Sequence, residues 1–264
     1  MTETSGGNSG NGEIALEARN LVKRYGSVEA LRGASFTARA GEVVALIGDN
    51  GAGKSTLVKC LSGAEIPDSG EILLDGKPIT LSTPTDARAH GIETVYQDLA
   101  VAPDLDPAAN LFLGRELMRK GLLGKLGMLD KSAMRKQAVD EFARLGVQLQ
   151  NADVSIGSLS GGQRQSVAVA RSVVWASKVV FMDEPTAALG VVQRERVLDV
   201  IKKVRDTGIS VVLISHNMPE VLAVADRIEV LRLGKRVARF TSAEATLEDL
   251  VGAMTGALSQ EDVA

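Results

Sequence analysis

The apolar positions of the chain follow two recurring patterns. Runs of consecutive Val, Ile and Leu occur at residues 42–47, 179–182 and 209–214, and a similar run spans residues 92–96. Runs of this length and composition predict strands that are buried in a sheet. Stretches with helical spacing separate them, so the chain alternates between strands and helices, which is typical of an α/β fold.

Looser alternation at both ends of the chain predicts additional strands. Three such runs precede the first buried strand, and we expect them to form a separate antiparallel β layer: residues 14–22, 28–31 and 34–37. A hairpin is predicted around the turn dipeptide Asp75-Gly76, and a closing hairpin is predicted through Gly234.

Apolar residues at helical spacing predict the helices. These span residues 57–61, 85–90, 108–120, 131–145, 163–177, 193–206, 219–225 and 244–255. Between residues 98 and 164 the pattern is helical alone, so we expect an inserted helical sub-domain there. Leu111, Phe112 and Leu113 within it fit either a core or a docking face for another protein.

The strongest chemical signal directly follows the first buried strand. It comprises Gly48, Asp49, Asn50, Gly51, Ala52, Gly53, Lys54, Ser55 and Thr56. The stretch fits G-x-x-x-x-G-K-[ST] between a strand and a helix, which is the context of a phosphate-binding loop. Its glycines let backbone N–H groups approach a polyphosphate, Lys54 reaches the β- and γ-phosphates, and Ser55 offers a hydroxyl to Mg²⁺. The loop indicates a nucleotide site but not what the protein does there.

A second stretch, Ser160-Gly161-Gly162-Gln163, opens the helix predicted over residues 163–177. Ser160 and Gln163 are spaced as a capping box, which by itself marks a well-formed helix start. Two glycines at a helix N-terminus also expose backbone N–H groups to an incoming anion. The residues alone leave both interpretations open.

Polar side chains follow three of the predicted buried strands. In parallel sheets, ligands bind beyond the carboxyl ends of the strands. Adjacent acids after an apolar run are often only solvated loop residues, but beside a phosphate loop we predict that Asp183 holds Mg²⁺, directly or through water, and that Glu184 polarises a water for in-line attack. His216 is placed to hold a γ-phosphate oxygen. Gln97 fits either a contact to metal or water, or a plain loop position.

Two further residues, Tyr25 and Cys60, flank the phosphate loop in the sequence. Tyr25, one of two tyrosines, precedes the loop and can stack on a base, although chemistry alone favours ordinary packing. Cys60 lies among apolar residues just after the loop, and we expect it to be a small buried hydrophobe.

Composition narrows the class of protein. Apolar residues make up 45% of the 264 residues and aromatic residues only 3%, so the core must be built from aliphatic side chains. The net charge of −3 does not indicate a nucleic-acid surface, which is normally basic. A single cysteine excludes an internal disulfide and favours a reducing compartment.

With no apolar run of about 18 residues, we expect no membrane span. Residues 1–13 and 257–264 are predicted to be tails, the first of them disordered and without an export signal.

Together, the motifs resemble those of ATP-binding-cassette (ABC) ATPases. They occur in that family's order over about residues 14–240: the phosphate loop, Gln97, the run Leu159-Ser-Gly-Gly-Gln163, Asp183-Glu184 and His216. The resemblance implies a P-loop NTPase (RecA-like) α/β core with an antiparallel β sub-domain and an inserted helical sub-domain, over residues 14–256. It also implies ATP hydrolysis, with ATP and Mg²⁺ bound.

The resemblance assigns roles to individual residues. Tyr25 resembles the aromatic residue that stacks on adenine, which replaces the packing interpretation. Gln97 resembles the residue that links Mg²⁺ and the attacking water to the helical sub-domain, and His216 resembles the switch histidine. The stretch from Ser160 to Gln163 resembles the signature that contacts ATP held by a second copy. Two copies would then sandwich ATP head to tail and drive membrane subunits docked on the helical sub-domain.

One departure from the family pattern narrows the resemblance. Where the family usually has Ser-Ala-Leu-Asp, this chain has Ala187-Ala-Leu-Gly190, so the Asp that couples the two sites is absent. This run, with Val95-Tyr-Gln-Asp-Leu99, is similar to the ATPases of simple-sugar importers. The similarity implies a homodimer under two permease subunits at the cytoplasmic face of the inner membrane, supplied by a periplasmic sugar-binding protein.

Three alternatives remain at this point. The chain can serve an ABC system for another substrate. It can be a non-transport cassette protein acting on ribosomes or DNA, although such proteins usually carry paired cassettes or coiled-coil insertions, and the sequence shows neither. A P-loop kinase is a third class, against which the signature stretch argues.

Overall fold

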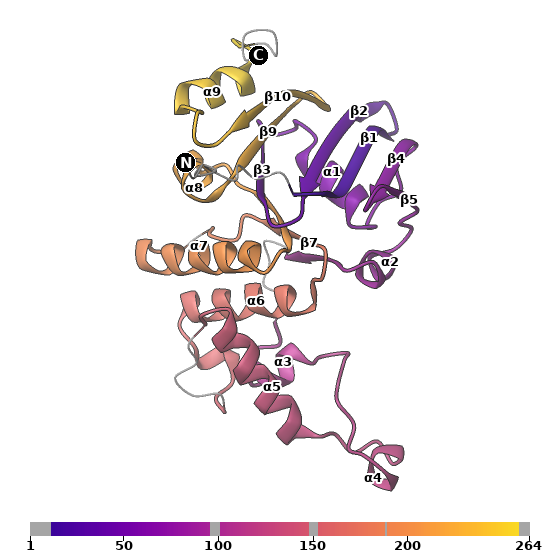
Figure 1. The fold of residues 1–264 in the computed structure, drawn as a ribbon, viewed down its shortest axis with the longest axis vertical. Coiled ribbons are helices and arrows are strands. Elements are labelled where there is room, and N and C mark those ends of the chain that lie inside the picture. The colour runs from indigo at the N-terminus through magenta and orange to yellow at the C-terminus, as the bar shows by residue number, and fades with distance from the viewer. Residues whose placement is uncertain (1–11, 96–100, 148–152, 188, 259–264) are drawn as a thin grey trace, which may run out of the picture.

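Two β-sheets organise the computed structural model, which describes residues 12–95, 101–147, 153–187 and 189–258 (Figure 1). The larger sheet has the order β10-β9-β3-β8-β7-β6. Its strands are β3 Val43–Ile47, β6 Ile92–Val95, β7 Val179–Asp183, β8 Ser210–Ile214, β9 Arg227–Arg232 and β10 Lys235–Thr241. All neighbouring strands are parallel except β9 and β10, which form the closing hairpin. The buried runs predicted from the sequence are therefore confirmed as strands of one sheet.

The smaller sheet is antiparallel, as predicted, with the order β2-β1-β4-β5. Its strands are β1 Ile14–Tyr25, β2 Val28–Arg39, β4 Ser69–Leu74 and β5 Lys77–Ile79. The two short strands expected between residues 28 and 37 are one continuous strand. Gly33, with φ of 85°, lies beside a register shift between Leu21 and Val22 of β1, so the apparent break is a β-bulge. The hairpin at Asp75-Gly76 is confirmed, and both residues have the positive φ that a two-residue turn needs.

Helices cover both faces of the larger sheet (Figure 1). Their bounds are α1 Lys54–Leu61, α2 Pro84–Ala89, α6 Gly161–Trp175, α7 Val191–Asp206, α8 Met218–Val224 and α9 Leu247–Thr255. Alternate residues of β3 enter two separate hydrophobic clusters. Val43, Ala45 and Ile47 pack with α6 to α9, whereas Val44 and Leu46 pack with α1 and the small sheet. Aliphatic side chains build most of both clusters, as the composition required.

The helical segment between β6 and α6 lies below α6 in Figure 1, and α4 is at its far end. It contains α3 Pro107–Leu111, α4 Leu122–Lys125, α5 Lys131–Arg144 and the 3₁₀ turn η1 Ile156–Ser158. The helix expected over residues 108–120 is wrong in extent, because the chain leaves helical geometry after Leu111 and turns at Gly114, whose φ is 78°. Leu111 and Phe112 are core residues, whereas Leu113 is 46% exposed.

Several predictions fall outside the described residues. Gln97 and most of each predicted tail, residues 1–11 and 259–264, belong to this group. The division of residues 14–256 into sub-domains stays a prediction. Across the described part of the chain, every helix is too short or too polar to traverse a bilayer.

Candidate functional site

The phosphate-binding stretch lies at the carboxyl end of β3 and leads directly into α1. This helix begins at Lys54, three residues before the predicted start, with Gly53 as its N-cap at φ 103°. A Cβ at Gly48 would lie 2.2 Å from the carbonyl oxygen of Leu231, and one at Gly53 would lie 2.7 Å from that of Ala30. Both glycines are needed because β2 and β9 press against the loop.

The loop forms one wall of a hollow of about 400 Å³. The opposite wall comes from β2 and from the β9–β10 turn: Val28, Glu29, Ala30, Arg32 and Leu233. The side chain of Val28 is 63% exposed there. Tyr25 ends β1 opposite Val28, its register partner in β2, and is 43% exposed. Lys23 Nζ lies 5.6 Å from the centroid of the Tyr25 ring.

Sequence reasoning missed this second wall. Its residues carry no motif and reach the loop only because β2 and the β9–β10 turn fold over it. The sole local signal is that Val28, an apolar residue, follows the Tyr25-Gly26 turn.

Lys54 is half-buried among the groups of the site. Its Nζ donates hydrogen bonds to the carbonyl oxygens of Gly48, at 2.6 Å, and Asp49, at 3.0 Å. Burial lowers the pKa of Lys54, while the carboxylates of Glu184, Asp49 and Asp183 favour its charged form. The phosphate loop and the acid pair therefore share one electrostatic site.

Glu184 and His216 are brought together because β7 and β8 are parallel neighbours, with Asp183 paired to Ile214. The Glu184 N–H donates to the carbonyl of Ile214 at 2.9 Å. Its Oε1 accepts a hydrogen bond from the His216 N–H at 3.1 Å and lies 2.7 Å from His216 Nδ1. Glu184 has φ of 48°, a left-handed conformation that side chains rarely adopt. Its carboxylate is thus held in place by the neighbouring strand end.

Asp183 contributes a second carboxylate at the same edge of the sheet. Burial and the adjacent Glu184 charge raise the pKa of Asp183, and Lys54 opposes this shift. Asp183, Glu184 and the Ser55 hydroxyl in the first turn of α1 offer oxygen ligands of the kind that a hard cation such as Mg²⁺ prefers. The described residues form no cluster of three or more His, Cys, Asp or Glu suited to a metal. A site completed by phosphate oxygens does not need such a cluster.

Ser160 caps α6 as the sequence predicts. Its Oγ accepts from the Gln163 N–H at 3.3 Å, and Gln163 Oε1 accepts from the Ser160 N–H at 3.1 Å. Ser160 and Gly161 are exposed, and none of residues 160–163 lines the hollow beside the phosphate loop of the same chain. The start of α6 therefore lies at the surface, outside the hollow of its own chain.

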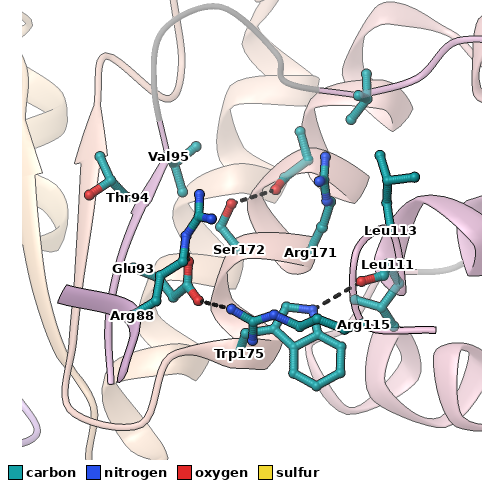
Figure 2. A pocket seen from close by; sticks show the side chains of 12 residues that line it. Arg88, Glu93, Thr94, Val95, Leu111, Leu113, Arg115, Arg171, Ser172 and Trp175 are labelled. Atoms are coloured by element: carbon teal, nitrogen blue, oxygen red, sulfur yellow. Dashed lines mark hydrogen bonds and ion pairs between the residues drawn. The ribbon is translucent and has the colours of Figure 1, made fainter. Parts of the chain in front are cut away.

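A second, smaller cleft of about 160 Å³ lies between β6, α6 and the segment after α3. Figure 2 shows Arg88, Arg115, Arg171, Glu93 and Trp175 around it. Arg115 donates to Glu93 at 2.7 Å and lies over the Trp175 ring at 4.7 Å. Burial, and next the Arg88 charge, lower the pKa of Arg171. The cleft brings three arginines and one glutamate together with apolar side chains.

Fold and site together define a P-loop nucleotide-binding protein, with phosphate loop, acid pair and histidine at the strand ends of a parallel sheet. The sequence model of the family described as "ABC transporter" matches residues 31–187. The chain belongs to this family and is an ABC ATPase. This confirms the resemblance drawn from the motifs, and with it the predicted fold class and enzyme class.

Similar proteins agree with this assignment. The chain is 54% identical to the fructose import ATP-binding protein FrcA of Rhizobium meliloti, over 93% of this chain and 95% of that protein. It is 45% identical to the xylose/arabinose import ATP-binding protein XylG of Sulfolobus acidocaldarius, over 91% and 93%. A solved ATP-binding cassette of an ABC transporter in its ADP conformation superposes with a TM-score of 0.76 at 25% identity, covering 95% of this chain and 98% of that one.

Proposed function

We propose that the chain hydrolyses ATP to energise import of a monosaccharide through a membrane permease. The observation that carries the chemical part is the meeting of Lys54, Asp183, Glu184 and His216 at one edge of the sheet. The extended similarity to ATP-binding proteins of fructose and xylose/arabinose import supports the substrate class.

The hollow beside the phosphate loop suits ATP. Tyr25 and exposed Val28 offer apolar surface to the adenine, while the N–H groups of residues 48–56 and Lys54 hold the phosphates. Ser55 and Asp183, with Gln97 outside the described residues, would hold Mg²⁺, which neutralises charge on the phosphates when bound.

Glu184 and His216 serve the attack on the γ-phosphate. The Glu184 carboxylate orients and polarises a water, and the backbone N–H of His216 holds its Oε1 at 3.1 Å. His216 is 79% exposed in its side chain, so it can turn to a phosphate oxygen at the open face of the site. The reaction then needs positioning and charge stabilisation more than covalent chemistry.

The outward-facing Ser160 turn completes the site of a second copy. The turn is exposed outside the hollow of its own chain, and the positive end of α6 favours an anion. Two copies arranged head to tail would each cover the other's γ-phosphate, and hydrolysis would release the pair.

The small cleft is the proposed docking place of the permease. Its described lining includes exposed Leu113, the Trp175 ring and the Arg88 side chain, which is 56% exposed. A short permease helix carrying a carboxylate and aliphatic side chains fits this surface. Such docking would place the chain peripherally at the cytoplasmic face of the inner membrane.

Charge reversal tests this docking. Arg88→Glu should abolish copurification with the permease while ATPase activity of the isolated chain stays unchanged. Arg19→Glu, at an exposed position of β1 in the small sheet, is the control and should retain the permease. Equal recovery of permease with both variants would contradict the assigned docking place.

The substrate class is tested on the complex purified from native membranes. A monosaccharide, delivered with the periplasmic fraction, should stimulate its ATPase activity several-fold. Stimulation by a substrate other than a sugar would redirect the assignment to another ABC system. Recovery with ribosomes or DNA instead of a permease would contradict a transport role.

A further inference from the structure

Glu220, in the first turn of α8, is a buried carboxylate that no motif singled out. Its side chain is only 7% exposed. Oε2 accepts a hydrogen bond from Thr186 Oγ1 at 2.5 Å, and Oε1 accepts one from Asn217 Nδ2 at 2.8 Å. Arg194 Nε lies 2.7 Å from Oε1. Two hydrogen bonds and one ion pair hold this buried charge in one orientation.

Each partner of Glu220 belongs to a different segment at the edge of the reaction site. Thr186 follows Glu184 by two residues, in the turn after β7. Asn217 is the residue after His216 and caps α8. The Glu220 carboxylate therefore joins the loop after β7 to the loop after β8. The same two loops carry Glu184 and His216, whose Oε1 and Nδ1 atoms lie 2.7 Å apart.

The third partner extends the network to the start of α7. Arg194 lies in the first turn of that helix and donates from Nη2 to the carbonyl of Leu189 at 3.4 Å. Leu189 precedes Gly190, the position at which this chain lacks the family's usual Asp. One carboxylate thus holds the loop after β7, the loop after β8 and the segment leading into α7.

We propose that Glu220 is a positioning residue for ATP hydrolysis: it fixes the spacing of the Glu184 and His216 loops without touching the substrate. The inference rests on the catalytic roles proposed for those two residues. Displacing reacting groups by about 1 Å is enough to slow an enzyme about 100-fold. A residue that fixes the spacing between the Glu184 and His216 loops therefore controls turnover.

The test compares turnover with nucleotide affinity in the full-length chain. Glu220→Ala should lower kcat for ATP about 10- to 100-fold, while the calorimetric Kd for ATP changes less than about twofold. Glu220→Gln, which keeps an acceptor oxygen, should recover part of the loss. Thr186→Val, which removes one bond of the network, should lower kcat less than Glu220→Ala does.

Glu229→Gln is the matched control. Glu229 is also buried and pairs with Arg227, Arg236 and Arg239, but it faces the small sheet through Thr37. The Glu229→Gln substitution should lower the Tm and leave kcat per nucleotide-binding molecule unchanged. If the Glu220 variants behave in the same way, Glu220 is merely structural and the inference is wrong.

Glu184→Gln, assayed in parallel, separates this inference from the proposed function. Full turnover in Glu184→Gln would remove the assigned base and with it the basis of the inference. Stalled Glu184→Gln beside fully active Glu220→Ala would overturn the positioning role alone.

Discussion

Lys54 experiences two opposing influences. Burial disfavours its charge, and three nearby carboxylates favour it. Its ammonium is held by two carbonyl oxygens of its own loop, at 2.6 and 3.0 Å. Phosphate oxygens are stronger acceptors, because the hydrogen bond is then charged on both sides. Lys54 is therefore poised to exchange these carbonyls for ATP.

Removing the Lys54 ammonium should weaken nucleotide binding. A hydrogen bond to a charged group contributes about 1.5–3 kcal/mol, so Lys54→Ala should raise the Kd for ATP about 10- to 100-fold. Lys59→Ala, exposed on the same helix, is the control and should bind normally. Unaltered calorimetric affinity in Lys54→Ala would count against the phosphate-loop assignment.

The raised pKa of Asp183 leads us to expect that the stability of the nucleotide-free protein depends on pH. Its folded-state pKa is raised, so the folded chain holds this proton more tightly than the unfolded chain. Stability is therefore lost as pH rises from the ordinary value of 3.8 through the raised pKa, and the cost is fully present at neutral pH. Asp183→Asn should raise the Tm at pH 7.5, and the gain should shrink as pH falls toward 4. A lower Tm at pH 7.5 would show that the carboxylate is already compensated.

At the scale of elements, the buried strands and the capping box of α6 were the most predictable features. The capping box at Ser160 and the strands ending at Asp183 and Ile214 follow from local pattern alone. The pattern failed over residues 108–120, where apolar spacing is helical. There Leu111 and Phe112 are buried by packing against α5 and α6, and Gly114 with positive φ turns the chain away. Tertiary packing overrode helix propensity in this segment.

The start of α6 combines a structural and a functional role. Ser160→Ala removes the cap and should cost about 1 kcal/mol of unfolding free energy. It should also weaken ATP-dependent pairing of two copies. Thr246→Ala removes an equivalent capping box from α9 and should cost a similar amount with pairing unaffected. Equal pairing in both variants would mean that Ser160 only caps the helix.

Gly190 is the N-cap of α7, with φ −69° and ψ 165°, an extended conformation that Asp accepts readily. Gly190→Asp should therefore fold normally and gain a few tenths of a kcal/mol, because Asp is a better N-cap than Gly. If the position governs coupling between sites, the Hill coefficient for ATP should change. An unchanged coefficient would show that the position is inert in coupling.

At the scale of the whole molecule, the sheet explains why separate motifs form one site. The order of β3, β8 and β7 places the ends of three sequence-distant strands side by side, and the sequence predicted each end without predicting their order. The second wall of the hollow, around Val28, and the Glu220 brace could not be predicted. Both depend on segments that meet only through the sheet order and carry no spacing signal of their own.

The central claim is that ATP is held between the Lys54 loop of one copy and the Ser160 turn of another. Glu184→Gln should bind Mg-ATP, lose turnover about 100-fold or more and elute as a dimer on size exclusion only with Mg-ATP. Adding Ser160→Arg to this variant should restore the monomer without loss of ATP binding. A Glu184→Gln protein that stays monomeric when saturated with Mg-ATP, or that hydrolyses at the normal rate, would contradict the account.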